Sequence, residues 1–173
     1  MSKKFVASRR VFIKLVGSTA GLMISGLSLP ITATSNEQPD LEFKLCTIHP
    51  DNSITIYNSR SEMGQGVMTS LTQLLLDELD ADWSQIREVK NSWADAERFG
   101  NQNTIGAISS LIGWMSHRQA GGKINLLLRQ TAAKIWQIDL AQVKTHKGKL
   151  HNAQTGQVLT FGQLTGAADI NNL

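Results

Sequence analysis

A strand pattern meets a helix pattern at Ser61-Glu62-Met63-Gly64-Gln65-Gly66-Val67-Met68-Thr69. Before this stretch, residues 53–57 alternate apolar and polar side chains, which is typical of a half-buried strand. After it, apolar residues recur at helical spacing, at Val67, Leu71, Leu74, Leu75 and Leu79. A two-glycine turn at such a junction presents backbone N–H groups at a helix N-terminus, where anionic or strongly polar ligands bind. Simple chain reversal uses the same kind of turn, so the local pattern leaves both interpretations open.

The polar residues around this turn do not form a recognisable catalytic motif. Glu62 has two possible roles, capping the turn or facing a ligand, and capping is the simpler prediction. Ser61 and the pair Ser109-Ser110 lack the G-x-S-x-G pattern of a serine hydrolase. The acidic run from Asp77 to Asp82 is typical of a solvated helix end, and docking of a partner is its alternative role. We therefore name no catalytic residue.

The basic charge of the chain is confined to its start. The formal net charge is +3, from 17 basic and 14 acidic residues, and five of the basic residues precede the first acid, Glu37. These five are Lys3, Lys4, Arg9, Arg10 and Lys14. Without them the balance is 12 basic to 14 acidic residues, or −2. No basic surface for nucleic acid is expected, and nucleic acid is not a predicted partner.

Residues 1–33 have the pattern of an export signal, with a basic start followed by an apolar stretch from Leu15 to Leu29. The twin-arginine pattern S-R-R-x-F-x-K is matched throughout by Ser8-Arg9-Arg10-Val11-Phe12-Ile13-Lys14. The apolar stretch would rise about 22 Å as a helix, less than a hydrocarbon core of about 30 Å. We expect the twin-arginine export machinery to deliver the chain to the periplasm or to a periplasm-facing membrane surface. Cleavage after Ala33, an uncleaved anchor and a basic membrane-surface helix remain alternatives.

The remaining sequence predicts an α+β fold. Residues 34–40 are polar and contain Pro39, which is typical of a linker. The pattern then predicts a hairpin, a helix, a strand, a long helix and short strands. The helices are expected at 67–81 and 108–138, with a short closing helix at 161–168. The strands are expected at 41–47, 53–58, 86–90, 143–146, 149–151 and 157–159. Gly121-Gly122 lies inside the long helix, so either another backbone packs closely there or the helix breaks.

Cysteine and histidine usage excludes several kinds of site. Cys46 is the only cysteine, so this chain can form no intrachain disulfide and cannot by itself ligate an iron–sulfur cluster. Its alternating context predicts a small buried residue in a strand. The four histidines show no familiar zinc spacing, and we predict no metal site made by this chain alone.

Several motifs together resemble the N-terminal region of molybdenum hydroxylase large subunits of the isoquinoline 1-oxidoreductase beta-subunit type. The family pattern S-E-M-G-Q-G-V-x-T is matched at residues 61–69, and the helix-ending E-L-D-x-x-W run is matched at residues 78–83. Residues 100–106 occupy the place of a T-G-G-S loop. Residues 118–123 resemble R-x-A-G-A-x-A-R, and residues 132–136 resemble the A-A-A-x-x-W that follows it. Two residues depart from the family pattern, Ile105 and Ala107, where glycine and serine are usual.

The resemblance implies a molybdopterin cofactor, commonly as its cytosine dinucleotide. It places Gly64, Gln65 and Gly66 against that cofactor, with Thr69 and Thr104 as further contacts. Full-length relatives oxidise aldehydes or hydroxylate N-heterocycles with oxygen from water. They pass electrons to a small subunit that carries two 2Fe–2S clusters and onward, often to a cytochrome c.

Relatives of this type are much longer, so residues 41–173 are expected to form part of a molybdopterin-binding domain that is inactive alone. The family's catalytic glutamate has no counterpart in this sequence. The alternative is an exported, non-catalytic binding or interaction module derived from the same fold.

Overall fold

The computed structural model of the chain describes residues 38–92 and 95–169, which lie within the compact unit Asn36–Leu173. The expected signal segment, residues 1–33, and the first part of the linker lie outside the described residues. Within the described ranges, none of the helices combines the length and apolar character needed to cross a membrane.

The junction at residues 61–69 follows a strand of the first sheet and leads into a helix. The sheet contains β1 (Leu41–Glu42), β2 (Cys46–Ile48), β3 (Ile54–Asn58) and β4 (Ile86–Asn91), in that order. The first two pairings are antiparallel, and β3 pairs with β4 in parallel. Helix α2 (Val67–Leu79) connects these two parallel strands, so the Gly-Gln-Gly turn follows the carboxyl end of β3. Ligands of α/β units commonly bind outside the carboxyl ends of parallel strands.

The prediction of one strand over residues 41–47 was wrong, because the chain reverses within it. β1 and β2 pair with each other, with Leu41 opposite Ile48, and the Phe43 N–H donates to the Cys46 carbonyl. Arg98 holds this reversal from far along the chain, donating to the carbonyls of Phe43 (2.7 Å) and Lys44 (3.1 Å). Its guanidinium also stacks on the Tyr57 ring. A contact between residues so distant in sequence leaves no local pattern.

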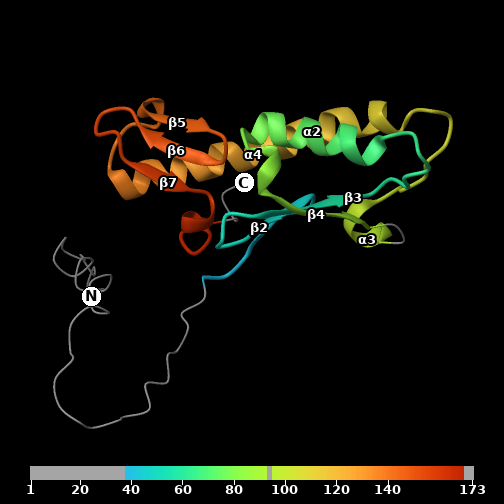
Figure 1. The fold of residues 1–173 in the computed structure, drawn as a ribbon, viewed down its shortest axis with the longest axis horizontal. Coiled ribbons are helices and arrows are strands. Elements are labelled where there is room, and N and C mark those ends of the chain that lie inside the picture. The colour runs from blue at the N-terminus through green and yellow to red at the C-terminus, as the bar shows by residue number, and fades with distance from the viewer. Residues whose placement is uncertain (1–37, 93–94, 170–173) are drawn as a thin grey trace, which may run out of the picture. The chain divides into compact units, whose positions relative to one another are not determined.

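Helix α4 (Ser109–Trp136) packs along α2, and both helices lie over one face of the first sheet (Figure 1). Gly121 lies at this contact, because a Cβ there would overlap the Leu75 carbonyl oxygen and lie 2.9 Å from the Glu78 Cβ. The helix is continuous through both glycines. Of the two explanations for Gly121-Gly122, close backbone packing is therefore correct for Gly121, whereas a Cβ at Gly122 would meet open space.

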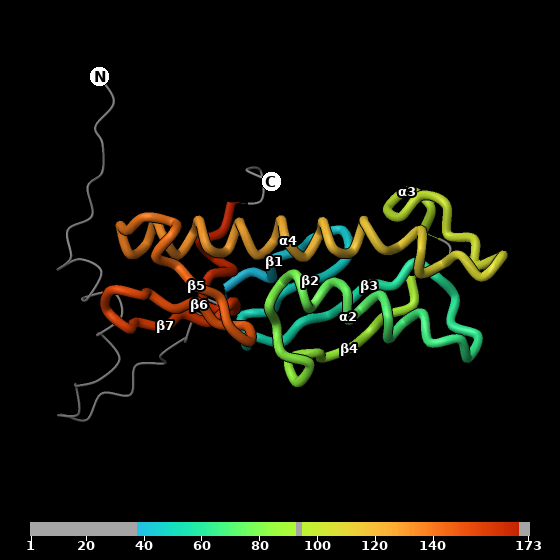
Figure 2. Tube along the Cα trace, turned by 90° about the horizontal axis from the view of Figure 1, so that it is seen from above, coloured from blue at the N-terminus to red at the C-terminus, as the bar shows by residue number. Residues whose placement is uncertain are grey.

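A second sheet packs against the carboxyl half of α4 (Figure 2). Its strands β5 (Val143–His146), β6 (Lys149–Asn152) and β7 (Val158–Thr160) are antiparallel in chain order, as the pattern predicted. Short 3-10 turns join the elements, at η1 (Trp83–Gln85), η2 (Leu140–Gln142) and η3 (Gly162–Leu164). The expected helix over 161–168 is reduced to η3. A short helix, α3 (Ala96–Phe99), lies between the strand expected at 86–90 and the helix expected at 108–138, where the sequence pattern predicts no helix.

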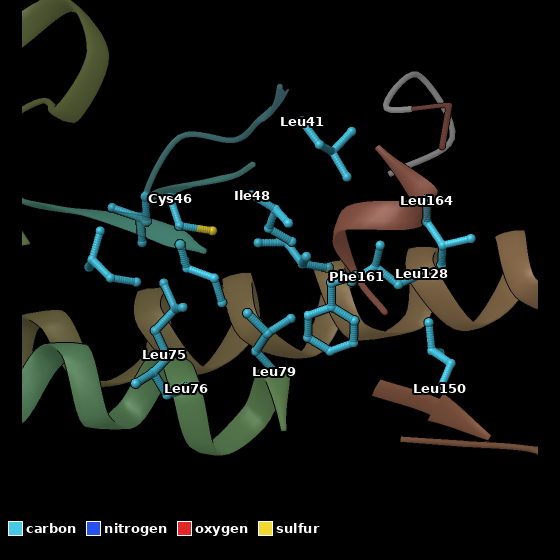
Figure 3. Packing of buried hydrophobic residues seen from close by; sticks show 14 of the residues in the cluster. Leu41, Cys46, Ile48, Leu75, Leu76, Leu79, Leu128, Leu150, Phe161 and Leu164 are labelled. Atoms are coloured by element: carbon cyan, nitrogen blue, oxygen red, sulfur yellow. The ribbon is translucent and has the colours of Figure 1, made fainter. Parts of the chain in front are cut away.

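One hydrophobic core serves both sheets (Figure 3). Phe161 lies between Leu79 and the second sheet and is fully buried. Further members of the cluster come from the first sheet, from both long helices and from the second sheet, among them Ile48, Leu75, Leu128 and Leu150. The predicted α+β class is confirmed, and the described residues form a single layered body rather than two independent sheets.

Cys46 is the predicted small buried residue of this core. Its side chain is fully buried at the start of β2, and burial raises the pKa of its thiol to about 12, against a smaller lowering by the Arg98 charge. Since the thiolate is the reactive form, we expect an aromatic disulfide reagent to leave the folded chain unmodified and to react with one thiol per chain in denaturant. Rapid stoichiometric reaction of the folded chain would contradict this burial.

Candidate functional site

The carboxylate of Glu62 binds the N-terminus of α2. One of its oxygens accepts from the N–H groups of Gly64 (2.8 Å) and Gly66 (2.9 Å), and the other accepts from Met68 (3.1 Å). The first expected role of Glu62, capping the turn, is confirmed. The chain itself therefore supplies the negative charge that this helix end favours.

Gln65 closes the same loop on itself. Its side-chain oxygen accepts from the Met63 N–H (2.6 Å), and its amide nitrogen donates to the Ser61 carbonyl (2.9 Å). Gly64 and Gly66 adopt φ angles of 91° and 78°, a left-handed conformation that favours glycine. The two glycines thus shape a turn whose N–H groups at Met63, Gly64 and Gly66 already have partners within it.

A second loop, residues 103–110, lies against this turn. Thr104 Oγ1 accepts from the Ser61 N–H at 2.9 Å, and Arg60 donates from Nη1 to the Asn103 carbonyl at 2.6 Å. Gly106 and Ala107 both have positive φ, which gives this loop a sharp bend. Ala107 takes a conformation that alanine seldom adopts, at one of the two positions that depart from the family pattern.

The two loops enclose a cleft of about 470 Å³. Its lining residues are Met63, Gln65, Val67, Thr104, Ile105, Gly106, Ala107, Ser109 and Ser110. Met63 and Ile105 are strongly exposed, with relative residue exposures of 70% and 68%. The lining therefore combines exposed apolar side chains with the hydroxyl groups of Thr104, Ser109 and Ser110.

The N-terminus of α4 opens onto this cleft through Ser109 and Ser110. Its N-cap residue is Ile108, which has no side-chain acceptor, and no acidic residue lies in the first turn. Among the described residues, no side chain accepts a hydrogen bond from the N–H groups of Ser109, Ser110 or Leu111. The helix end that can receive a ligand is thus that of α4, while the end of α2 is occupied by Glu62.

The structure brings only some of the predicted contact residues to the cleft. Gln65 and Thr104 line it, Gly64 and Gly66 form the adjoining turn, and Thr69 is exposed on the first turn of α2. Their contact with a cofactor stays a prediction. Sequence reasoning missed Ser109 and Ser110, although a long helical pattern beginning without a capping residue could have indicated them.

Other polar clusters are structural. His49 links Asp40 (2.8 Å) to the Thr55 hydroxyl (2.9 Å), but Thr55 is buried in the first sheet and lies outside any described cleft. Asp80 and Asp82 accept backbone N–H groups from Lys147 and Ser84. The described residues contain no group of three or more His, Cys, Asp or Glu side chains that could hold a metal ion.

Because Glu62 caps α2 as a carboxylate, we expect the stability of the chain to fall at acid pH. Hydrogen bonds from Met68 and then Gly66 lower the pKa of Glu62 below its usual value of 4.5. The cap's contribution is therefore complete above that pH and is lost as pH falls through the lowered pKa. We expect Glu62→Gln to lower the melting temperature at neutral pH, with a difference from wild type that shrinks as the pH falls through the lowered pKa of Glu62.

Thermal unfolding from neutral to acid pH measures this effect, with Glu42→Gln, an exposed β1 residue, as the matched control. A Glu62→Gln deficit that stays constant down to the most acidic pH would show that the carboxylate charge plays no part in the cap.

Similarity to known proteins now identifies the fold. The family model described as "Molybdopterin cofactor-binding domain" matches residues 3–172. The isoquinoline 1-oxidoreductase subunit beta of Brevundimonas diminuta is 30% identical over 129 residues, covering 71% of this chain and 16% of that protein. A membrane-bound aldehyde dehydrogenase (pyrroloquinoline-quinone) of Gluconacetobacter polyoxogenes is 34% identical, covering 52% of this chain and 11% of that one.

A solved structure gives the same fold. Reconstituted CO dehydrogenase from Oligotropha carboxidovorans superposes with a TM-score of 0.55 at 18% identity, over 70% of this chain and 15% of that one. The chain thus spans about a sixth or less of the length of these relatives. The match over nearly its whole length places it in the group that its motifs resemble: the chain belongs to the molybdopterin cofactor-binding domain family.

Proposed function

We propose that this chain contributes one wall of the molybdopterin site of an oxidoreductase. The observation that carries this proposal is the cleft of about 470 Å³ between the Gly-Gln-Gly turn and the 103–110 loop, which is also lined by the first residues of α4, a helix without a side-chain cap. Thr104 holds the two loops together through Ser61, so the cleft is a fixed feature of the fold.

The residues of the cleft fit a flat, polar-edged group that carries a phosphate. Met63 and Ile105 supply apolar walls, and Thr104 and Ser110 supply hydroxyl groups. The N–H groups of Ser109 and its successors, together with the helix dipole, favour an anionic edge. Because Glu62 already neutralises the end of α2, the phosphate would be held by α4 and not by Gly64 and Gly66.

In the proposed enzyme the molybdenum cofactor supplies the centre for oxygen transfer from water to substrate. The names of the relatives suggest aldehydes or N-heterocycles as substrates. We also propose the cytosine dinucleotide as the cofactor's form. We further propose a small subunit with 2Fe–2S clusters and a cytochrome c as electron-transfer partners. Twin-arginine export would place the assembly at the periplasm. The chain alone is proposed to be catalytically inactive.

The proposal is tested by introducing a negative charge at the N-terminus of α4. Ile108 is its N-cap and is partly exposed, so Ile108→Asp places a carboxylate on the free N–H groups. We expect the variant to be at least as stable as wild type, and to retain about tenfold less pterin when produced in a host that makes molybdenum cofactor. Pterin is measured by its fluorescence after oxidative release from the purified chain.

Ile108→Asn is the matched control, since it caps the helix without adding charge, and we expect it to lose less pterin than Ile108→Asp. Equal retention by wild type and Ile108→Asp would overturn the assignment of α4, and absence of pterin from wild type would overturn the proposed function.

A further inference from the structure

A second cleft, of about 560 Å³, lies between α4 and the segments that flank the first sheet. Its polar lining comes from Lys44 in the β1–β2 turn, Ser59 and Arg60 after β3, and His117, Gln119 and Lys123 on α4. Every charged residue that lines it is basic, and no carboxylate is among its lining residues in the described part of the chain. None of its lining residues also lines the cleft between the Gly-Gln-Gly turn and the 103–110 loop, which we call the cofactor cleft.

Arg60 is a buried cation without a matching anion. Arg60 is only 7% exposed, and its Nη1 donates a hydrogen bond to the Asn103 carbonyl. In the described ranges no carboxylate forms an ion pair with it, whereas Arg87 and Arg118 on the surface pair with Asp51 and Glu78. A buried charge is costly unless an opposite charge or several hydrogen bonds compensate it.

His117 adds an unpartnered nitrogen at the same wall. The residue is 2% exposed, and its Nδ1 lies 2.9 Å from the Gly113 carbonyl, an acceptor, so Nδ1 carries the proton. Nε2 is buried and has no hydrogen-bond partner among the described residues. Burial lowers the pKa of His117, the hydrogen bond to the Gly113 carbonyl opposes this, and the nearby Arg60 charge adds a smaller lowering, so the imidazole is neutral at physiological pH. Its Nε2 is then a free acceptor beside a buried cation.

We propose that this cleft binds inorganic phosphate or a phosphate monoester. The phosphate oxygens meet the charges of Arg60, Lys44 and Lys123, and a protonated phosphate oxygen donates to Nε2 of His117. If the imidazole takes up the proton, Nε2–H donates to the phosphate instead. In either state the ligand satisfies both the buried cation and the unpartnered nitrogen. The proposal does not depend on the cofactor cleft.

A comparison of the affinities for phosphate and sulfate distinguishes this site from a general basic surface. It has the shape and charge of phosphate but carries no proton near neutral pH, so it leaves a neutral Nε2 unsatisfied. At about pH 7.5 we expect the full chain to bind inorganic phosphate, whose HPO4²⁻ form still carries a proton, about tenfold more tightly than sulfate. Calorimetric titration gives the affinities, and the same titration with methyl phosphate at about pH 6, where this ester retains a proton, shows whether the site also takes an ester.

Three variants test the assignment of residues. His117→Leu is expected to abolish the preference for phosphate over sulfate while the melting temperature stays the same or rises, because a buried unsatisfied nitrogen is removed. Lys123→Gln is expected to weaken both anions about threefold, through the loss of an exposed charge. Lys134→Gln, on the same helix away from the cleft, is expected to change neither affinity.

Equal affinity of the wild-type chain for phosphate and sulfate would overturn the proposal. Retention of the phosphate preference by His117→Leu would overturn it as well, since the preference would then arise elsewhere. Because His117→Leu is expected to fold at least as stably as wild type, its binding result is not masked by unfolding.

Discussion

Gly121→Ala is expected to lower the free energy of unfolding by about 2 to 3 kcal/mol, the cost of forcing extra volume into a packed contact. The added Cβ would overlap the Leu75 carbonyl oxygen and crowd the Glu78 Cβ. A backbone carbonyl of α2 cannot turn aside as a flexible side chain does, so the two helices must move apart. The residues buried between them would then lose contact with one another.

Gly122→Ala is the matched control, one residue along the same helix. A Cβ there meets no atom within 4 Å, so only helix propensity changes and we expect a gain of up to about 1 kcal/mol. Chemical denaturation of the two variants and wild type measures the difference. If both substitutions changed stability equally, the close approach of α2 and α4 at Gly121 would be incorrect.

Gly148→Ala is expected to cost about 2 to 4 kcal/mol, from backbone strain and from displacement of a bonded side chain. Gly148 turns the β5–β6 hairpin with a φ of 70°, and its N–H donates to the Asp80 carbonyl. A Cβ would overlap the amide of Gln85. That amide accepts from the Asp82 N–H (2.8 Å) and donates to the Asn52 carbonyl (3.0 Å), so moving it breaks both bonds.

Gly156→Ala is the matched control, because it introduces backbone strain without a steric overlap. It has the same φ of 70°, in the β6–β7 turn, and a Cβ there meets open space. We expect a cost of about 1 kcal/mol, from left-handed strain alone. Equal losses in the two variants, again measured by denaturation, would mean that the second sheet does not depend on the Gln85 contact.

Much of the fold could be predicted from local pattern. The helical spacing from Val67 gave α2 within two residues of its end, where Asp80 takes a left-handed conformation. The short strands of the second sheet were also recovered, because glycines mark their turns. The β1–β2 reversal could not be predicted, since Arg98 holds it from more than fifty residues away.

The sequence motif located the candidate site, but it did not predict which backbone groups of the site are free to bind a ligand. The Gly-Gln-Gly turn indicated the right region of the fold, and Thr104 proved to be joined to it. The motif could not show that Glu62 folds back onto the N–H groups of its own turn. Nor could it show that the N-terminus of α4, more than forty residues later, opens onto the same cleft. His117 and Arg60 gave no signal, because their burial depends on packing between distant segments.

The central claim is that an anionic pterin group binds at the N-terminus of α4, beside an α2 end already capped by Glu62. NMR spectra of the backbone amides of the ¹⁵N-labelled full chain, recorded with and without 6-carboxypterin, test it most directly. We expect the largest shifts at Ser109, Ser110 and Leu111, and smaller shifts at Gly64 and Gly66. Shifts confined to Gly64 and Gly66, or no shift at the α4 N-terminus, would contradict the account.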